Sequence, residues 1–256
     1  MTLLFDLDDT LVVEEASAEA AFRATCRLAH EQTGVDPETM YTSIRESCRA
    51  FWRNSPARPY CLSVGISSWE GLWAQFHGDD DNLRILAEWA PTYRSDSWRE
   101  ALHRCGCEGD DAIVEELSEA YVRERRMRHI VYDDVLAVLT YCRQKHRLGL
   151  LTNGTPDLQR AKLEGSGLGS FFDSVVVSGE VGFGKPDVRI FELTLERLGG
   201  SAASAFMIGN SLQTDVEPAM KLGITGVWVN RERKARDDSV VPDIEVTSLA
   251  ELEAIL

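Results

Sequence analysis

Carboxylate, hydroxyl, amide and lysine side chains gather at four places in this sequence, and most of these clusters directly follow an apolar run. The clusters are Asp6-Leu7-Asp8-Asp9-Thr10, Thr152-Asn153-Gly154, Gly184-Lys185-Pro186-Asp187, and Gly209-Asn210-Ser211 followed by Asp215. Polar residues at the ends of buried strands are typical of proteins that bind ligands at one edge of a parallel sheet. If the fold brings the four clusters together, they form a single polar site.

Asp6 and Asp8 define the chemistry that such a site could perform. They are two positions apart, so in an extended chain both side chains point to the same side. Two close carboxylates repel, and both stay ionised only beside a cation, for which magnesium is suited because it prefers oxygen ligands. One carboxylate could attack phosphorus, while the other protonates the leaving oxygen and then activates water. Lys185 would supply positive charge to the phosphoryl group, and Thr152 a hydroxyl donor.

The apolar runs before these clusters predict short strands. They lie at residues 3–7, 148–152, 175–178, 205–209 and 225–229, and after residue 130 they alternate with segments of helical length. Strands separated by helices imply right-handed crossovers and a mainly parallel sheet. In such a sheet the ligand binds outside the carboxyl ends of the strands, which is where the polar clusters fall. The sequence therefore predicts an α/β fold with a Rossmann-like parallel sheet.

Residues 15–130 have helical periodicity instead, and their helix boundaries are readable. Gly34 ends the first run, and Asp36-Pro37 is typical of an N-cap followed by the first helical residue. Ser67-x-x-Glu70 and Ser97-x-x-Glu100 resemble capping boxes. Most of the tryptophans in this segment are expected in its core: Trp52, Trp69, Trp73, Trp89 and Trp98. The simplest arrangement is a helical insertion after the first strand.

In order and in residue type, the four clusters resemble the four motifs of the haloacid dehalogenase (HAD) superfamily. Enzymes of this superfamily often carry a helical cap directly after the first strand. The resemblance implies a HAD-like α/β core formed by residues 1–14 and 131–256, with an inserted α-helical cap at residues 15–130.

The resemblance also implies a role for each residue of the first three motifs. Asp6 is expected to be the nucleophile, which forms an aspartyl-phosphate, and a metal ligand. Asp8 is expected to be the general acid and base, with its backbone carbonyl also on the metal. Thr152 and Asn153 would bind the phosphoryl group, and Lys185 would neutralise that group and steady Asp6.

The fourth motif implies the rest of a Mg²⁺ site, with Asn210 and Asp215 completing it directly or through water. The family usually has aspartate where this chain has Asn210, and an amide oxygen can ligate magnesium but brings no negative charge. Taken alone, Asp215 could also be the N-cap of the helix that contains Ala219. Thr10 is expected mainly to hydrogen-bond the backbone of its own loop.

The expected reaction is the hydrolysis of a small phosphorylated metabolite, a phosphomonoester, with magnesium. Two alternatives remain open at this point. The first is 2-haloacid dehalogenation, whose enzymes need no metal and lack the second aspartate of the first motif, so Asp8 argues against it. The second is a non-catalytic protein that binds phosphorylated ligands, for which Asn210 would be a sign of decay.

Composition limits the partners. The 256 residues include 44% hydrophobic residues and carry a formal net charge of −15. Such a chain can bury a large core, and its charge repels nucleic acid and anionic lipid. The absence of a long apolar run or a leader predicts no membrane span and a cytoplasmic protein. Six scattered cysteines indicate reduced thiols. The sequence carries no signal for an oligomeric state.

Overall fold

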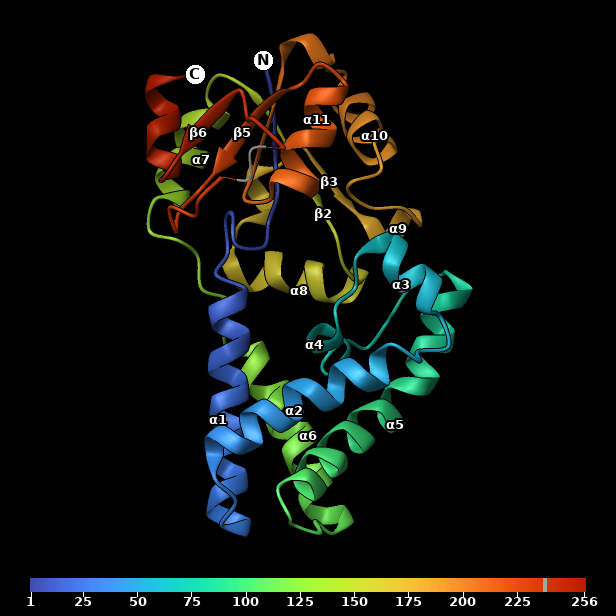
Figure 1. Ribbon diagram of the computed structural model, residues 1–256. Helices are drawn as coiled ribbons and strands as arrows, with labels where there is room; N and C mark the ends of the chain where they lie inside the picture. The colour runs from blue at the N-terminus through green and yellow to red at the C-terminus, as the bar shows by residue number, and fades with distance from the viewer. Residues whose placement is uncertain (237–238) are drawn as a thin grey trace. The chain divides into compact units, whose positions relative to one another are not determined.

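The computed structural model describes residues 1–236 and 239–256, which divide into two compact units (Figure 1). The α/β unit comprises Met1–Val13, Ile130–Asn153 and Gln159–Leu256. The helical unit comprises Glu14–His129 and Gly154–Leu158. Each unit buries a hydrophobic core of its own.

The α/β unit is built on a six-stranded sheet with the strand order β3-β2-β1-β4-β5-β6, and all neighbouring strands are parallel. The strands are β1 (Thr2–Phe5), β2 (Arg147–Thr152), β3 (Ser174–Val177), β4 (Ala205–Gly209), β5 (Thr225–Val229) and β6 (Ile244–Val246). The predicted parallel sheet is confirmed, and β6 is a strand that the sequence patterns did not indicate. The order reverses at β1, which pairs with β2 on one side and β4 on the other. Ligands bind at such a switch point in doubly wound sheets.

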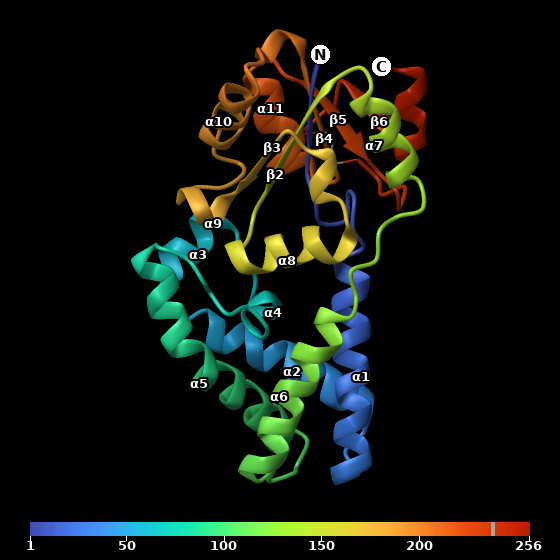
Figure 2. The same cartoon turned by 180° about the vertical axis from the view of Figure 1, so that it is seen from behind.

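Helices cover both faces of this sheet (Figures 1 and 2). Leu3 and Phe5 of β1 pack with α7 (Val135–Arg143) and η4 (Leu249–Ala254) on one face. Leu4 points to the other face, which α10 (Arg189–Leu198) and α11 (Glu217–Lys221) cover. Side chains alternate along a strand, so a strand with a helix layer on each side must be apolar throughout.

Five further elements complete the described chain beyond residue 155. They are α8 (Pro156–Ser166), η1 (Gly169–Phe171), α9 (Ser178–Val181), η2 (Ala202–Ser204) and η3 (Leu212–Val216), a π-helical turn. From Gln159 onward, α8 belongs to the α/β unit. Within residues 1–236 and 239–256, every helix is too short or too polar to cross a bilayer.

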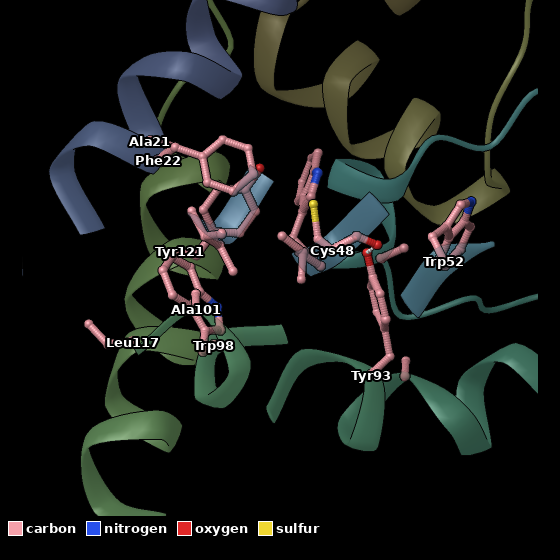
Figure 3. Packing of buried hydrophobic residues seen from close by; sticks show 14 of the residues in the cluster. Ala21, Phe22, Cys48, Trp52, Tyr93, Trp98, Ala101, Leu117 and Tyr121 are labelled. Atoms are coloured by element: carbon pink, nitrogen blue, oxygen red, sulfur yellow. Dashed lines mark hydrogen bonds between the residues drawn. The ribbon is translucent and has the colours of Figure 1, made fainter. Parts of the chain in front are cut away.

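The helical unit contains α1 (Glu15–Thr33), α2 (Pro37–Trp52), α3 (Arg58–Val64), α4 (Ser68–Gly71), α5 (Asp81–Arg104) and α6 (Asp111–Arg126). In this unit α1 packs against α2 and α6, and α2 packs against α5 (Figure 2). Aromatic rings fill the space between these helices (Figure 3). The rings of Phe22 and Tyr121 are 4.5 Å apart, and those of Trp52 and Tyr93 are 5.2 Å apart. The buried tryptophans Trp52, Trp73 and Trp98 confirm the expected core.

Most of the predicted helix boundaries are present in the helical unit. Gly34 ends α1 with a φ of 75°, Asp36 accepts a hydrogen bond from the Thr39 backbone N–H, and Ser67 forms a capping box with Glu70. The capping box predicted at Ser97 is wrong. Ser97 lies inside α5, where its hydroxyl donates to the Tyr93 carbonyl one turn earlier, a bond that serine can make within a helix.

Candidate active site

Asp6 follows β1 and lies beside β4, because its backbone N–H donates to the Ile208 carbonyl at 3.0 Å. Its Oδ1 accepts a bond from Lys185 Nζ at 2.5 Å, although the two residues are 179 positions apart in sequence. The same ammonium donates to Asp215 Oδ1 at 2.6 Å. All three residues are at least 94% buried: Asp6 and Lys185 are 6% exposed and Asp215 is 1% exposed. The structure thus brings together one lysine and two carboxylates from three separate segments: the loop after β1, the loop before α10, and η3.

Burial decides the electrostatics of this group. Loss of water raises the pKa of the Asp6 carboxyl; the Lys185 ammonium opposes that rise, and the Asp215 carboxylate adds to it. Burial alone would lower the pKa of Lys185, but Asp215 and Asp6 outweigh it and raise the pKa above its usual range. Lys185 therefore remains protonated near neutral pH. The group contains two carboxyl groups and a single ammonium, so a bound cation would favour the ionised form of Asp6.

Thr10 joins the loop after β1 to the loop after β4. Its fully buried hydroxyl lies 3.1 Å from Asp6 Oδ2 and 3.4 Å from Asn210 Oδ1, and it accepts a bond from the Asn210 backbone N–H at 3.0 Å. Trp228 Nε1 holds the same loop by donating to the Asn210 carbonyl at 2.9 Å. The expectation that Thr10 mainly bonds the backbone of its own loop is wrong for its side chain, whose partners are the Asp6 carboxylate and Asn210 of the fourth motif.

Asp215 is held from both of its oxygens. Oδ1 accepts from Lys185, and Oδ2 accepts from the Ser211 backbone N–H at 3.0 Å. The N-cap of α11, the helix that contains Ala219, is Val216, so the capping alternative for Asp215 is wrong. A Cβ on Gly209 would lie 2.4 Å from Asp215 Oδ2. Only glycine at that position lets the Asp215 side chain fold across the end of β4.

Asp8 belongs to a second group of side chains. Both of its carboxylate oxygens accept bonds from Lys162 Nζ, at 3.0 and 2.9 Å. Gln159 Nε2 donates to Asp8 Oδ2 at 3.0 Å and to Thr152 Oγ1 at 2.6 Å. The sequence reasoning missed Gln159 and Lys162. The available signal was their spacing of three on the helix that follows Thr152-Asn153-Gly154, which places them on one helix face.

Asn153 connects the second motif to the third. Its side-chain Nδ2 donates to the Lys185 carbonyl at 2.7 Å, and its Oδ1 accepts from the Lys185 N–H at 2.8 Å. The peptide bond between Lys185 and Pro186 is cis. A Cβ on Gly184 would lie 2.5 Å from Asn153 Oδ1, so glycine is needed for this close approach. The Asn153 amide therefore fixes the backbone of the residue whose ammonium reaches Asp6.

The oxygens near Thr10 fit a magnesium ion. In the described part of the chain, no three His, Cys, Asp or Glu side chains are grouped as a metal site. The oxygens available here are Asp6 Oδ2 and Asn210 Oδ1, which lie 3.1 and 3.4 Å from the Thr10 hydroxyl oxygen. Magnesium is commonly held by one or two carboxylates, with waters and a substrate phosphate as the remaining ligands. One carboxylate oxygen and one amide oxygen are therefore suitable ligands for a magnesium ion.

Residues 1–223 match the family model of haloacid dehalogenase-like hydrolases, and the chain belongs to this family of enzymes. A curated relative, the phosphoserine phosphatase of Thermus thermophilus, is 39% identical over 251 residues, which cover 98% of this chain and 96% of the relative.

Solved structures share the fold over the whole chain. The HAD-hydrolase YfnB from Bacillus subtilis, solved with magnesium bound, has a TM-score of 0.67 at 25% identity and covers 100% of this chain and 97% of its own. A 2-haloacid dehalogenase from Pseudomonas syringae has a TM-score of 0.62 at 23% identity, covering 99% of this chain and 96% of its own. The second likeness concerns the fold alone.

Proposed function

We propose that the protein is a magnesium-dependent phosphatase that hydrolyses a small phosphomonoester through an aspartyl-phosphate on Asp6. The observation that carries this proposal is the 2.5 Å contact between Lys185 Nζ and Asp6 Oδ1, in a buried group of two carboxyl groups and one ammonium. A second carboxylate, Asp8, lies two residues after Asp6 in the chain and would transfer protons. The relative named phosphoserine phosphatase supports the reaction class.

The first half of the reaction transfers the phosphoryl group to the protein. A carboxylate oxygen of Asp6 forms a bond to phosphorus while the bond from phosphorus to the ester oxygen breaks. The electron pair of that bond leaves with the ester oxygen, which takes a proton from the Asp8 carboxyl. Lys185 and the Thr152 hydroxyl stabilise the negative charge on the transferring phosphoryl oxygens.

The second half returns the phosphoryl group to water. The Asp8 carboxylate takes a proton from a water molecule, whose oxygen forms a bond to phosphorus while the bond from phosphorus to Asp6 breaks. Inorganic phosphate leaves, and Asp6 regains its carboxylate. The sum is ester plus water giving alcohol plus phosphate, with Asp8 protonated again at the end.

Asp6, Asn210 and the Asp8 backbone carbonyl would hold the magnesium ion. When bound, the ion supplies positive charge that orients the phosphate and balances its negative charge. Asn210 is the better candidate for a direct ligand than Asp215, because Asp215 already gives its two oxygens to Lys185 and to the Ser211 N–H. Asp215 then acts on the site by holding Lys185 in place.

The helical segment would act as a cap over the reaction. We assign residues 1–14 and 131–256 to the catalytic core and residues 15–130 to the cap, which would exclude water once substrate is bound. YfnB undergoes interdomain movement, which supports a mobile cap for this chain as well.

Phosphate release from p-nitrophenyl phosphate in the presence of magnesium tests the proposal. Wild type should be active, and Asp6→Asn should lose at least about 10⁴-fold in kcat/KM because it removes the nucleophile. Asp173→Asn is the matched control. Asp173 is an exposed aspartate just before β3 whose carboxylate accepts from the Leu148 N–H, so this variant should keep wild-type activity.

Two results would overturn the proposal. Activity of Asp6→Asn near the wild-type level would exclude Asp6 as the nucleophile. Chloride release from 2-chloropropionate that persists in EDTA, with no phosphatase activity, would replace it with the dehalogenase alternative.

A further inference from the structure

A second lysine of the α/β unit, Lys162 of α8, is buried against Asp8. Its side chain is 2% exposed, and its Nζ lies 3.0 and 2.9 Å from the two oxygens of the Asp8 carboxylate. We propose that Lys162, with Gln159 one turn before it, is a positioning residue that fixes the Asp8 carboxylate for proton transfer. This inference rests on the proposed function, in which Asp8 gives a proton to the leaving oxygen.

Both oxygens of Asp8 are held from α8. Oδ2 accepts bonds from Lys162 Nζ and Gln159 Nε2, at 2.9 and 3.0 Å. Oδ1 accepts a bond from Lys162 Nζ at 3.0 Å. Donors on both oxygens restrict rotation of the carboxylate, so its orientation is fixed before the proton moves.

The charge of Lys162 has a direct effect on the first half of the reaction. When Asp8 passes its proton to the leaving oxygen, its O–H bond breaks, the electron pair stays on the carboxylate, and a new O–H bond forms on the ester oxygen. Negative charge thus develops on Asp8 next to an ammonium already in place. Preorganised charge of this kind stabilises a transition state without reorganisation of the surroundings.

Gln159 also connects Asp8 to the phosphoryl-binding motif, because its amide contacts Thr152 and Asn153. Its Nε2 also lies 2.6 Å from both Thr152 Oγ1 and the Asn153 carbonyl, so its two hydrogens are shared among three acceptors. The Thr152 hydroxyl itself donates to the Asn153 carbonyl at 3.4 Å, a long bond that it can exchange for one to a phosphoryl oxygen. Gln159 Oε1 is buried without a hydrogen-bond partner in the part of the chain that the structure describes. All the recorded hydrogen bonds of the Gln159 side chain are therefore made by its amide nitrogen.

The ion pair between Arg160 of α8 and Glu180 provides a comparison, because it is much more exposed than the pair between Lys162 and Asp8. Arg160, two residues before Lys162, pairs with Glu180 at 2.8 Å, and the two side chains are 48% and 29% exposed. Such a pair keeps most of its hydration. Lys162 has instead been withdrawn almost completely from water, which is unfavourable for an ammonium unless a partner compensates it. An apolar residue would anchor α8 at lower cost, so the buried charge points to a task at Asp8.

The leaving group of the substrate provides the test. Phenyl phosphate has a poor leaving group that needs a proton, whereas 2,4-dinitrophenyl phosphate has a good one that does not. Lys162→Met should lower kcat/KM for phenyl phosphate by roughly 10- to 100-fold and for the dinitrophenyl ester by less than about threefold. Lys162→Arg, which keeps a cation able to bond both oxygens, should recover most of the loss. Arg160→Met is the matched control and should behave as wild type with both esters.

A double variant separates positioning from general structure. If Lys162 acts through Asp8, adding Lys162→Met to Asp8→Asn should lower kcat/KM for phenyl phosphate no further than about twofold. Equal losses on both esters, or a loss in the Asp8→Asn background as large as in wild type, would overturn the inference. Should Lys162→Met fail to fold, Lys162→Gln supplies a shorter neutral side chain for the same comparison.

The same measurements distinguish this inference from the proposed function. If wild type hydrolyses neither ester, or if Asp8→Asn shows no dependence on the leaving group, the assigned chemistry itself fails. If Asp8→Asn shows that dependence and Lys162→Met does not, only the role of Lys162 is wrong.

Discussion

Asp6 and Asp8 are two residues apart, and each meets a buried lysine, but the two lysines are used differently. Lys185 divides its ammonium between Asp6 and Asp215, at 2.5 and 2.6 Å. Lys162 places its ammonium against both oxygens of Asp8. The side chain of Asp6 is 8% exposed, whereas that of Asp8 is 24% exposed.

The difference corresponds to the two tasks proposed for these carboxylates. Asp6 is held by Lys185 and Thr10, which come from separate loops, so its position depends on the assembly of the whole sheet. Asp8 is held by Gln159 and Lys162, which come from a single helix. A nucleophile has to be fixed relative to phosphorus, while an acid and base needs a defined orientation and access to a proton.

Removal of Lys185 should have the largest effect, because it leaves two buried carboxylates without their cation. Lys185→Met should lower kcat/KM by about 10³-fold or more, and it should destabilise the fold by roughly 3–5 kcal/mol. Lys162→Met should destabilise less, since its partner Asp8 can gain hydration. Denaturant unfolding of the two variants measures this difference directly.

A compensating change tests the cause. In the Lys185→Met background, Asp215→Asn removes one of the two unpaired charges and should restore part of the lost stability without restoring activity. If Lys185→Met is no less stable than Lys162→Met, the contrast between the two lysines is wrong.

Thr10 should show the next largest effect, because it supplies the second contact to Asp6. Thr10→Val keeps the shape but removes the hydroxyl, which leaves buried acceptor and donor groups unpaired and should cost about 1–3 kcal/mol of stability. We expect kcat/KM to fall by roughly 10- to 100-fold as Asp6 loses its orientation. Thr194→Val is the control, since Thr194 is equally buried but donates within α10 to the Ile190 carbonyl. A loss of activity in both variants would show that Thr10 has no special role.

The sequence predicted the core of the fold well, because the signals were local. Short apolar runs mark β1 to β5, and glycine, serine and aspartate mark most of the helix ends. The strand that escaped notice, β6, has only three residues, Ile244–Val246, too few for a periodic pattern. Ser97 was misread because a serine followed three residues later by a glutamate also occurs inside helices, and the continuous apolar face of α5 decided the outcome.

The sequence predicted those site residues that belong to the four strand-end motifs. Asp6, Lys185 and Asp215 meet in the structure, as strand ends of one parallel sheet allow. The partners of Asp8 were not predictable in this way. Gln159 and Lys162 lie on a helix, outside any strand-end cluster, and only the docking of α8 brings them to the loop after β1. Contacts of that kind depend on packing rather than on local pattern.

Asn210→Asp tests which groups hold the metal and should give a smaller effect. An added carboxylate beside Asp6 should lower the magnesium concentration for half-maximal activity by roughly tenfold. At saturating magnesium we expect kcat within about threefold of wild type, since the ligand geometry is kept. Asn54→Asp adds the same charge at an exposed position of the helical unit and should leave the metal dependence unchanged. A large loss at saturating metal would refute the assignment of Asn210 as a direct ligand.

Substitution of Asp134 should have the smallest effect on activity, because the role of this carboxylate is structural. Arg231 bonds both of its oxygens, at 3.0 and 2.9 Å, and Ser248 Oγ and the Leu249 N–H bond Oδ2 as well. Burial alone would raise the pKa of Asp134, but these hydrogen bonds outweigh it and hold the pKa below its usual value. A lowered pKa in the folded state means that the stabilisation is fully present above about pH 4, the value for free aspartate, and is lost as the pH falls through the folded value.

Asp134→Asn should therefore destabilise the protein by about 1–2 kcal/mol at neutral pH, and the gap to wild type should shrink as the pH falls below about 4. Denaturant unfolding across that pH range measures the gap. Activity should change little, because Arg231 still reaches the Thr10 carbonyl, to which it donates at 3.0 Å. A gap that stays constant with pH would mean that the charge of Asp134 is irrelevant. A large loss of activity would mean that the loop after β1 depends on this pair as strongly as on Lys185.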